Sequence, residues 1–144
     1  MPAQRRRVEV FISHASCDEW VAKQIARRIE QFKVATFLSE LHIKLGDEDF
    51  EDRLLEALDQ CSELIVLLTP EALQRPYVWM ELGAVWKTRK RASVILYRLA
   101  VEDLRRRSEV PLFLLKSELI DINRDTERFL KQLQARFRAS RTRR

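Results

Sequence analysis

Glycine is scarce in this chain, with only Gly46 and Gly83 among 144 residues. The sequence holds neither a G-x-G-x-x-G fingerprint nor a Walker-type loop, so the usual backbone cradles for phosphate groups are missing. Histidine is equally scarce, and His14 and His42 have no evident set of metal-ligating partners. We therefore expect neither a metal site nor a resident cofactor.

Long apolar runs and paired cysteines are also lacking. No hydrophobic stretch approaches the length needed to cross a bilayer. The basic start of the chain resembles that of a signal peptide, but the apolar part after it is short and Glu9 interrupts it. Cys17 and Cys61 match no metal spacing and no disulfide framework. These absences predict a cytoplasmic location without a membrane partner.

Positive charge is abundant but concentrated at the two ends of the chain. The formal net charge is +5, and without the terminal arginines the body would be net acidic. Those arginines are Arg5, Arg6, Arg7, Arg136, Arg138, Arg141, Arg143 and Arg144. The clusters KTRKR (87–91) and RRR (105–107) remain inside the body. A folded nucleic-acid reader is expected to carry a basic face, so solvated tails explain this pattern better than a nucleic-acid partner.

The length and composition suit one globular domain. Hydrophobic residues make up 46% of the chain and charged residues 34%, as in ordinary folded proteins. We expect a basic tail over residues 1–7, the domain over residues 8–138 and a second basic tail over residues 139–144.

Strand-like and helix-like segments alternate along the chain. Apolar, β-branched segments predict strands over residues 8–12, 34–38, 63–69, 93–97 and 118–122. Helical spacing predicts helices from a cap at Asp18 to about Phe32, over residues 48–61 and 77–88, and from a cap at Asn123 or Asp125 to near Phe137. In the first helix the apolar spacing includes Trp20, and residues 98–117 look irregular.

This alternation predicts an α/β fold with a flavodoxin-like, five-stranded parallel sheet in the order 2-1-3-4-5 and helices on both faces. In such folds ligands bind at the carboxyl ends of the strands, between strands 1 and 3. Ser13–Ser16, the Gly46 loop and the turn at Thr69 should meet there. A response-regulator receiver has this topology but needs carboxylates where Ser13 and Thr69 stand, which excludes that class.

The segment PYVWMELGAVW (76–86) carries a single charge, Glu81. Tyr77 lies four positions earlier, on the same face of the expected helix. Glu81 could mark the solvent-facing edge of an amphipathic helix, but its flanking residues are apolar, as in a buried helix. A buried carboxylate needs a partner or a chemical task. The pattern favours a functional carboxylate, with a structural ion pair as the alternative.

Three segments together resemble the Toll/interleukin-1 receptor (TIR) domain family over about residues 8–133. VFISHAS (10–16) resembles the first family box, and residues 39–73 resemble the BB loop, second helix and third strand. PYVWMELGA (76–84) resembles the stretch in which enzymatic members carry a catalytic glutamate, in the form found in prokaryotic TIR domains.

The resemblance implies cleavage of NAD⁺ at its nicotinamide–ribose bond. It assigns the catalytic role to Glu81, a position near the nicotinamide ribose to Tyr77, and stacking on nicotinamide to Phe50. From the residues alone, Phe50 is equally well explained as helix core.

The resemblance also implies that Ser13, His14 and Ala15 form the loop after the first strand and contact the dinucleotide. Ser13 could instead shape the turn, and His14 could be an ordinary polar loop residue.

These features lead to an NAD⁺ glycohydrolase, or a cyclase, that is activated by self-association in cell-death or antiviral defence signalling. The main alternative is a non-catalytic TIR module that only assembles with other TIR domains. A third, weaker hypothesis is a related enzyme that cleaves nucleosides. The expected partners are NAD⁺, other TIR domains and a sensor on another protein or in a longer chain.

Overall fold

The computed structural model describes residues 8–40, 56–74, 90–106 and 117–142. Five parallel strands form one sheet in the order β2-β1-β3-β4-β5, which confirms the predicted topology. The strands are β1 (Val10–His14), β2 (Thr36–Glu40), β3 (Glu63–Leu68), β4 (Arg91–Leu96) and β5 (Glu118–Asp121). The helical elements are η1 (Ser16–Asp18), α1 (Glu19–Glu30), residues 56–60, η2 (Ala72–Gln74), α4 (Val101–Arg105) and α6 (Thr126–Thr142).

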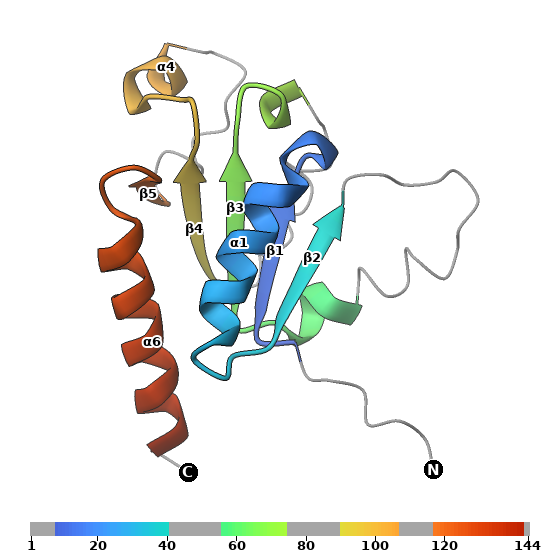
Figure 1. The fold of residues 1–144 in the computed structure, drawn as a ribbon, viewed down its shortest axis with the longest axis vertical. Coiled ribbons are helices and arrows are strands. Elements are labelled where there is room, and N and C mark those ends of the chain that lie inside the picture. Colours follow the sequence, from blue (N-terminus) through green and yellow to red (C-terminus); the bar gives the residue numbers. More distant parts are fainter. Residues whose placement is uncertain (1–7, 41–55, 75–89, 107–116, 143–144) are drawn as a thin grey trace, which may run out of the picture.

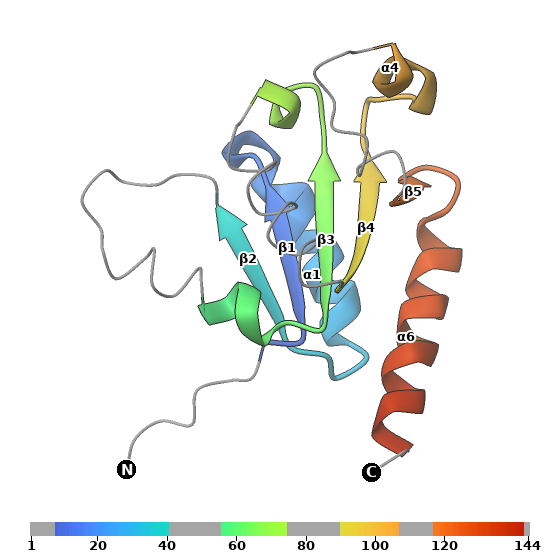
Figure 2. The ribbon, with the colours of Figure 1, turned by 180° about the vertical axis from the view of Figure 1, so that it is seen from behind.

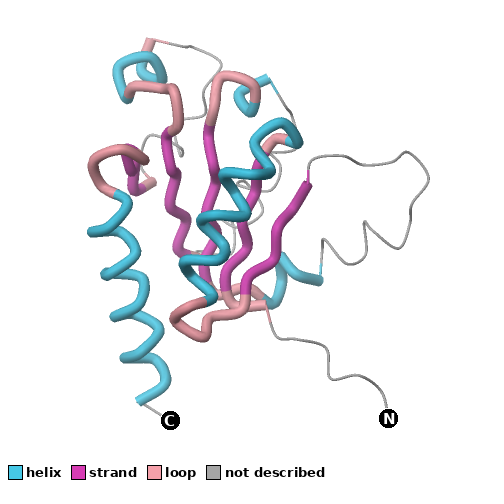
Figure 3. Tube along the Cα trace, in the orientation of Figure 1, coloured by secondary structure: helices cyan, strands magenta, loops and turns pink. Residues whose placement is uncertain are grey.

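The sheet is built around β3, which pairs in parallel with β1 on one side and β4 on the other (Figure 3). All six residues of β3 are buried. This burial explains its nearly continuous apolar sequence, since a central strand of a parallel sheet is covered on both faces.

Successive residues of each strand contribute to two separate cores. Val10 and Ile12 face a cluster with apolar residues of α1 and α6, whereas Phe11 faces a cluster with Ala57 and Leu58. Figures 1 and 2 show α1 on one face of the sheet and residues 56–60 on the other. We call these the α1 face and the opposite face. Helices thus cover both faces of the sheet, as predicted.

The first helix differs from the prediction in two respects. Asp18 precedes α1, but its side chain makes no capping hydrogen bond to the helix. Trp20 is 72% exposed, although the predicted apolar spacing included it. The reason is geometric: the buried stripe of α1 runs through Ala22, Ile25, Ala26 and Ile29, and the indole lies to one side of it.

Several strand boundaries also differ from those predicted. β1 continues through Ser13 and His14, which the sequence assigned to a loop. The two polar residues stay in the sheet because β1 pairs with β2 as far as His14. The predicted irregular region after β4 contains the short helix α4. Backbone pairing therefore extends beyond the apolar residues that mark a strand in the sequence.

The last helix is longer than expected and its arginines make specific contacts. α6 continues past Phe137 to Thr142, so residues 139–142 belong to the helix. Arg136 donates two hydrogen bonds to the buried Glu63 carboxylate, at 2.8 and 3.1 Å. Arg141 donates to the carbonyl oxygen of Lys33 and lies 3.5 Å from the Glu9 carboxylate. Some of the terminal arginines thus stabilise the fold.

Part of the predicted architecture lies outside the described residues. The helix expected over residues 48–61 is described only at residues 56–60, and the helix expected over residues 77–88 is not described. Within the described part of the chain, none of the helices has the length and hydropathy required to cross a membrane.

Replacing Arg136 with alanine should lower the free energy of unfolding by about 1–3 kcal/mol, because the buried Glu63 carboxylate loses its bidentate partner. The matched control is Arg138→Ala on the exposed side of α6, which should change stability by less than about 0.5 kcal/mol. Urea denaturation measures both. Equal, small losses for the two variants would contradict a stabilising role for the Arg136–Glu63 pair.

Candidate functional site

The carboxyl edge of the sheet gathers polar groups from three connections. η1 follows β1, the Thr69 turn and η2 follow β3, and Arg98 follows β4. These connections lie together at the top of Figure 1, where the arrowheads of β1, β3 and β4 point. In this strand order the edge between β1 and β3 is the place where ligands bind.

The Asp18 carboxylate is the buried charge at this edge. Asp18 is only 4% exposed, and its Oδ2 accepts a 2.6 Å hydrogen bond from the Thr69 hydroxyl. The Thr69 oxygen in turn accepts a 3.1 Å hydrogen bond from the backbone N–H of Ala72, at the start of η2. One hydroxyl therefore links the turn after β1 to the turn after β3.

Arg98 brings the end of β4 into the same network. Its guanidinium lies 3.6 Å from Asp18 Oδ1 and donates two hydrogen bonds to Glu71, at 2.9 and 3.2 Å. It also lies over the Tyr97 ring, 5.1 Å from the centroid. Arg98 adopts the left-handed conformation with φ 57°, which is unfavourable for a non-glycine residue. We infer that these side-chain contacts hold the backbone in this conformation.

The network also affects the acidity of its exposed members. The pKa of the Glu71 carboxyl is lowered. The larger cause is its hydrogen bond to the backbone of Glu71, and the next is its contact with Arg98. Desolvation, and then the charges of Asp18 and Glu71, raise the pKa of the exposed Cys17 thiol. Cys17 is therefore more firmly protonated than an ordinary cysteine and is a weaker nucleophile at neutral pH.

Cys17, Asp18 and Glu71 place one potential metal-ligand atom each within 4.8 Å of one another. Two of the three groups already have partners, since Asp18 binds Thr69 and Glu71 binds Arg98. The guanidinium supplies the positive charge that two neighbouring carboxylates require. These contacts explain the cluster without a metal ion.

Ser13, His14 and Ala15 lie at the carboxyl end of β1 and are all buried. The His14 Nδ1 donates a 2.8 Å hydrogen bond to the carbonyl oxygen of Ala15. The Ser13 hydroxyl and the His14 Nε2 have no hydrogen-bond partner among the described residues. Ser13 shares the opposite face with Phe11, whereas His14 lies on the α1 face with Ile12. Their predicted contact with a dinucleotide remains a prediction.

Glu81, Tyr77 and Phe50 lie outside the described residues. The last described residue before the Glu81 segment is Gln74, which ends η2 at the carboxyl edge. The chain therefore enters that segment from the edge where the Asp18 network lies.

The sequence did not predict the roles of Glu71 and Arg98. Asp18 was expected as a helix cap, and the turn at Thr69 was expected at the ligand-binding edge but without a role for the Thr69 hydroxyl. One signal in the sequence could have indicated the role of Arg98. This arginine directly follows an apolar strand, and a charged side chain at the carboxyl end of a strand lies at the ligand-binding edge.

Strand order, helical layers and a polar carboxyl edge define a flavodoxin-like α/β protein. The TIR domain model matches residues 10–134, and the chain belongs to the TIR domain family.

Two solved structures share the fold. The TIR domain of the Toll-related receptor TRR-2 from Hydra magnipapillata superposes with a TM-score of 0.59 at 20% identity, covering 94% of this chain and 98% of that one. A diflavin flavoprotein A3 from Nostoc sp. reaches a TM-score of 0.56 at 13% identity, covering 95% of this chain and 99% of that one. At these identities the likeness concerns the fold alone. No curated protein matches the chain in sequence.

Thr69→Val should destabilise the domain by about 2–3 kcal/mol, because it removes the donor to a buried carboxylate and the acceptor for a backbone N–H. Thr69→Ser keeps both hydrogen bonds and loses one methyl group, so it should cost only about 1 kcal/mol. Urea denaturation of the pair checks this difference. Equal stability of the two variants would show that the hydroxyl contributes little.

Cys17 should react with iodoacetamide more slowly than a cysteine in an unstructured peptide, because its raised pKa leaves less thiolate. Glu71→Gln removes a nearby negative charge and should increase the rate about twofold or more. Mass spectrometry of the peptide containing Cys17 measures both rates, with buried Cys61 as an internal reference. A wild-type rate equal to that of the free peptide would contradict the described electrostatics.

Proposed function

We propose that this TIR domain cleaves NAD⁺ at the nicotinamide–ribose bond, as a glycohydrolase or a cyclase. The observation that carries the proposal is the single carboxylate, Glu81, in the apolar segment 76–86 of a chain that belongs to the TIR family. The position of Gln74 at the carboxyl edge supports it, because the chain enters this segment beside the ligand-binding edge of the fold.

The proposed reaction suits a site with one acid. Nicotinamide leaves C1′ of the ribose as a neutral molecule from a cationic ring, so no general acid is required. The transition state resembles an oxocarbenium ion, as in glycoside hydrolysis. The Glu81 carboxylate would stabilise the developing positive charge and accept hydrogen bonds from the ribose hydroxyls. Attack of water on C1′ gives ADP-ribose and a proton, whereas attack by an adenine nitrogen gives a cyclic product.

In this proposal the Asp18 network is a support for the site. Thr69 and Arg98 fix the turns at the carboxyl edge, on which the dinucleotide would lie beside Ser13–Ala15. Tyr77 would lie near the nicotinamide ribose and Phe50 would stack on the ring. Association with other TIR domains would complete the site and couple activity to cell-death or antiviral defence signalling in the cytoplasm.

The second candidate function is assembly without catalysis. Membership of the TIR family is the observation behind this alternative, since TIR domains generally associate with other TIR domains. A scaffold would associate with other TIR domains and release no nicotinamide, so catalysis distinguishes the two functions.

Wild-type protein at high concentration should release nicotinamide from NAD⁺, with a rate per molecule that rises with protein concentration. Glu81→Gln should reduce the rate at least about 100-fold, because the carboxylate acts on the transition state. The matched control is Glu102→Gln in α4, an exposed glutamate that should leave the rate unchanged. Chromatography separates nicotinamide, ADP-ribose and cyclic products.

Nicotinamide release that is no faster with the wild type than with Glu81→Gln would remove the enzymatic proposal. If both proteins nevertheless self-associate, that result would favour the scaffold function.

A further inference from the structure

A hollow lies on the α1 face of the sheet, away from the residue 56–60 helix. Its volume is about 490 Å³, within the range of about 300–1,000 Å³ typical of small-molecule sites. Its walls come from α1, the residue after β4, the loop after β5 and the start of α6. We call it the α1–α6 pocket. Among the described residues predicted to bind NAD⁺, which are Ser13, His14 and Ala15, none lines it.

The interior of the α1–α6 pocket is apolar and its margin carries an aromatic ring. Ile25, Tyr97 and Leu130 are among the residues that line it. Trp20, also part of the lining, is the one large hydrophobic side chain of the described residues that is mostly exposed, at 72%. An exposed indole contributes little to the core, and its flat face is available for stacking.

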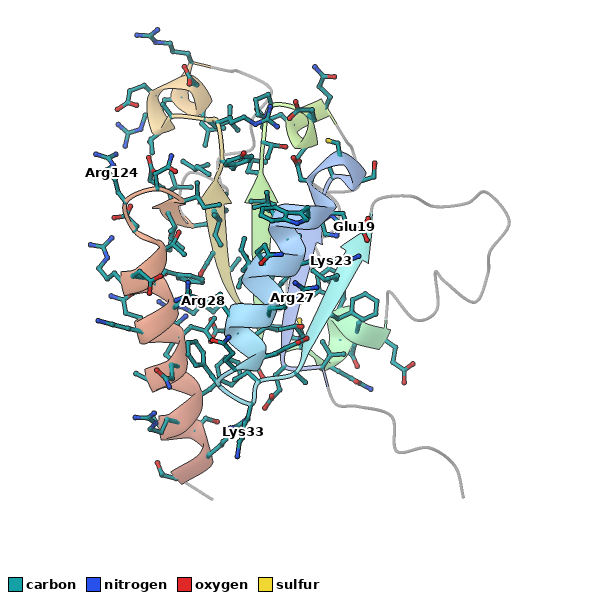
Figure 4. The ribbon with its side chains drawn as sticks, in the orientation of Figure 1. Glu19, Lys23, Arg27, Arg28, Lys33 and Arg124 are labelled. Atoms are coloured by element: carbon teal, nitrogen blue, oxygen red, sulfur yellow. The ribbon has the colours of Figure 1, made fainter. Side chains whose placement is uncertain are left out.

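The margin also carries two arginines. Arg28 of α1 donates a 2.9 Å hydrogen bond to Glu127 of α6 and so spans the two helices. Arg124 lies 3.6 Å from Asp121, and its side chain is 82% exposed. Figure 4 shows Arg28 on the α6 side of α1 and Arg124 near the amino end of α6. Gln24 and Asn123 also line the pocket.

We propose that the α1–α6 pocket binds a purine nucleoside monophosphate. The base would stack on Trp20, where stacking of a nucleic-acid base on an aromatic side chain is favourable. The phosphate would bind Arg124, and Arg28 once its ion pair with Glu127 loosens, because guanidinium groups match phosphate oxygens. The amides of Gln24 and Asn123 offer both donors and acceptors to the base edge.

This combination points to a nucleotide because each part of the ligand has a matching partner. An apolar ligand would leave the arginines unused, and free phosphate would leave the indole exposed. Glu127 carries a negative charge that opposes an anion and it accepts a hydrogen bond from Arg28, so it should weaken nucleotide binding. The pocket needs neither Glu81 nor NAD⁺ cleavage, and the inference is therefore independent of the proposed function.

Isothermal titration calorimetry with AMP and GMP tests this inference on the full chain. At least one of the two should bind saturably at one site per chain, and Glu81→Gln should bind it equally well. Adenosine and inorganic phosphate should each bind more weakly. Trp20→Ala should weaken binding about tenfold, from the loss of stacking. Arg124→Ala should weaken it several-fold.

Glu127→Gln provides the directional test. It removes the charge that opposes phosphate and frees Arg28, so it should tighten nucleotide binding several-fold. Lys23→Ala is the matched control, since Figure 4 shows Lys23 on the β2 side of α1 and it does not line the pocket. This control should leave binding unchanged, and circular dichroism should show that every variant is folded.

No saturable binding of either nucleotide would overturn the inference, as would equal binding by folded Trp20→Ala or weaker binding by folded Glu127→Gln. Sedimentation of the same proteins tests whether a second copy of the chain, instead of a nucleotide, covers this face. Self-association that requires Trp20, without nucleotide binding, would show that a second copy of the chain covers this face and would also overturn the inference.

Discussion

The buried carboxylate of Asp18 is the constraint on which the carboxyl edge of this domain depends. A buried charge requires hydrogen bonds and an opposite charge, and here Thr69 and Arg98 provide them. These three residues come from the turns after β1, β3 and β4. The requirements of one carboxylate thereby fix three connections relative to one another, and Thr69 also fixes the start of η2 through Ala72.

The residues that hold the carboxyl edge together are different from the residue proposed to carry out the reaction. Asp18, Thr69, Glu71 and Arg98 satisfy one another, so they are suited to holding the edge in one conformation. The proposed reaction instead requires a carboxylate whose environment responds to substrate, and Glu81 is the candidate for that role. The α1–α6 pocket lies beyond this network, with polar groups that remain at the margin of an open hollow. The network at the carboxyl edge is thus internally paired, whereas Trp20 and Arg124 at the α1–α6 pocket are largely exposed.

Local periodicity predicted much of the fold. The buried, continuous run of β3 and the alternation of strands and helices were enough to predict the sheet order. The contacts that fix the edge were not predictable, because Asp18 and Thr69 are 51 residues apart and meet only when the sheet forms. The role of Arg136 was missed for the same reason, since an arginine in a basic run gives no sign that Glu63 faces it. The exposure of Trp20 was missed because the predicted apolar spacing included it, whereas the buried stripe of α1 leaves the indole to one side.

The central proposal is that a dinucleotide binds at the carboxyl edge between β1 and β3. Its most direct test is an NMR titration of isotopically labelled Glu81→Gln protein with NAD⁺, which follows binding without turnover. The account predicts that amide shifts concentrate in residues 13–18 and 69–74, beside the Asp18 network. Shifts confined to the amino edge of the sheet, near Glu63 and Arg136, or no shifts at saturating NAD⁺, would contradict it.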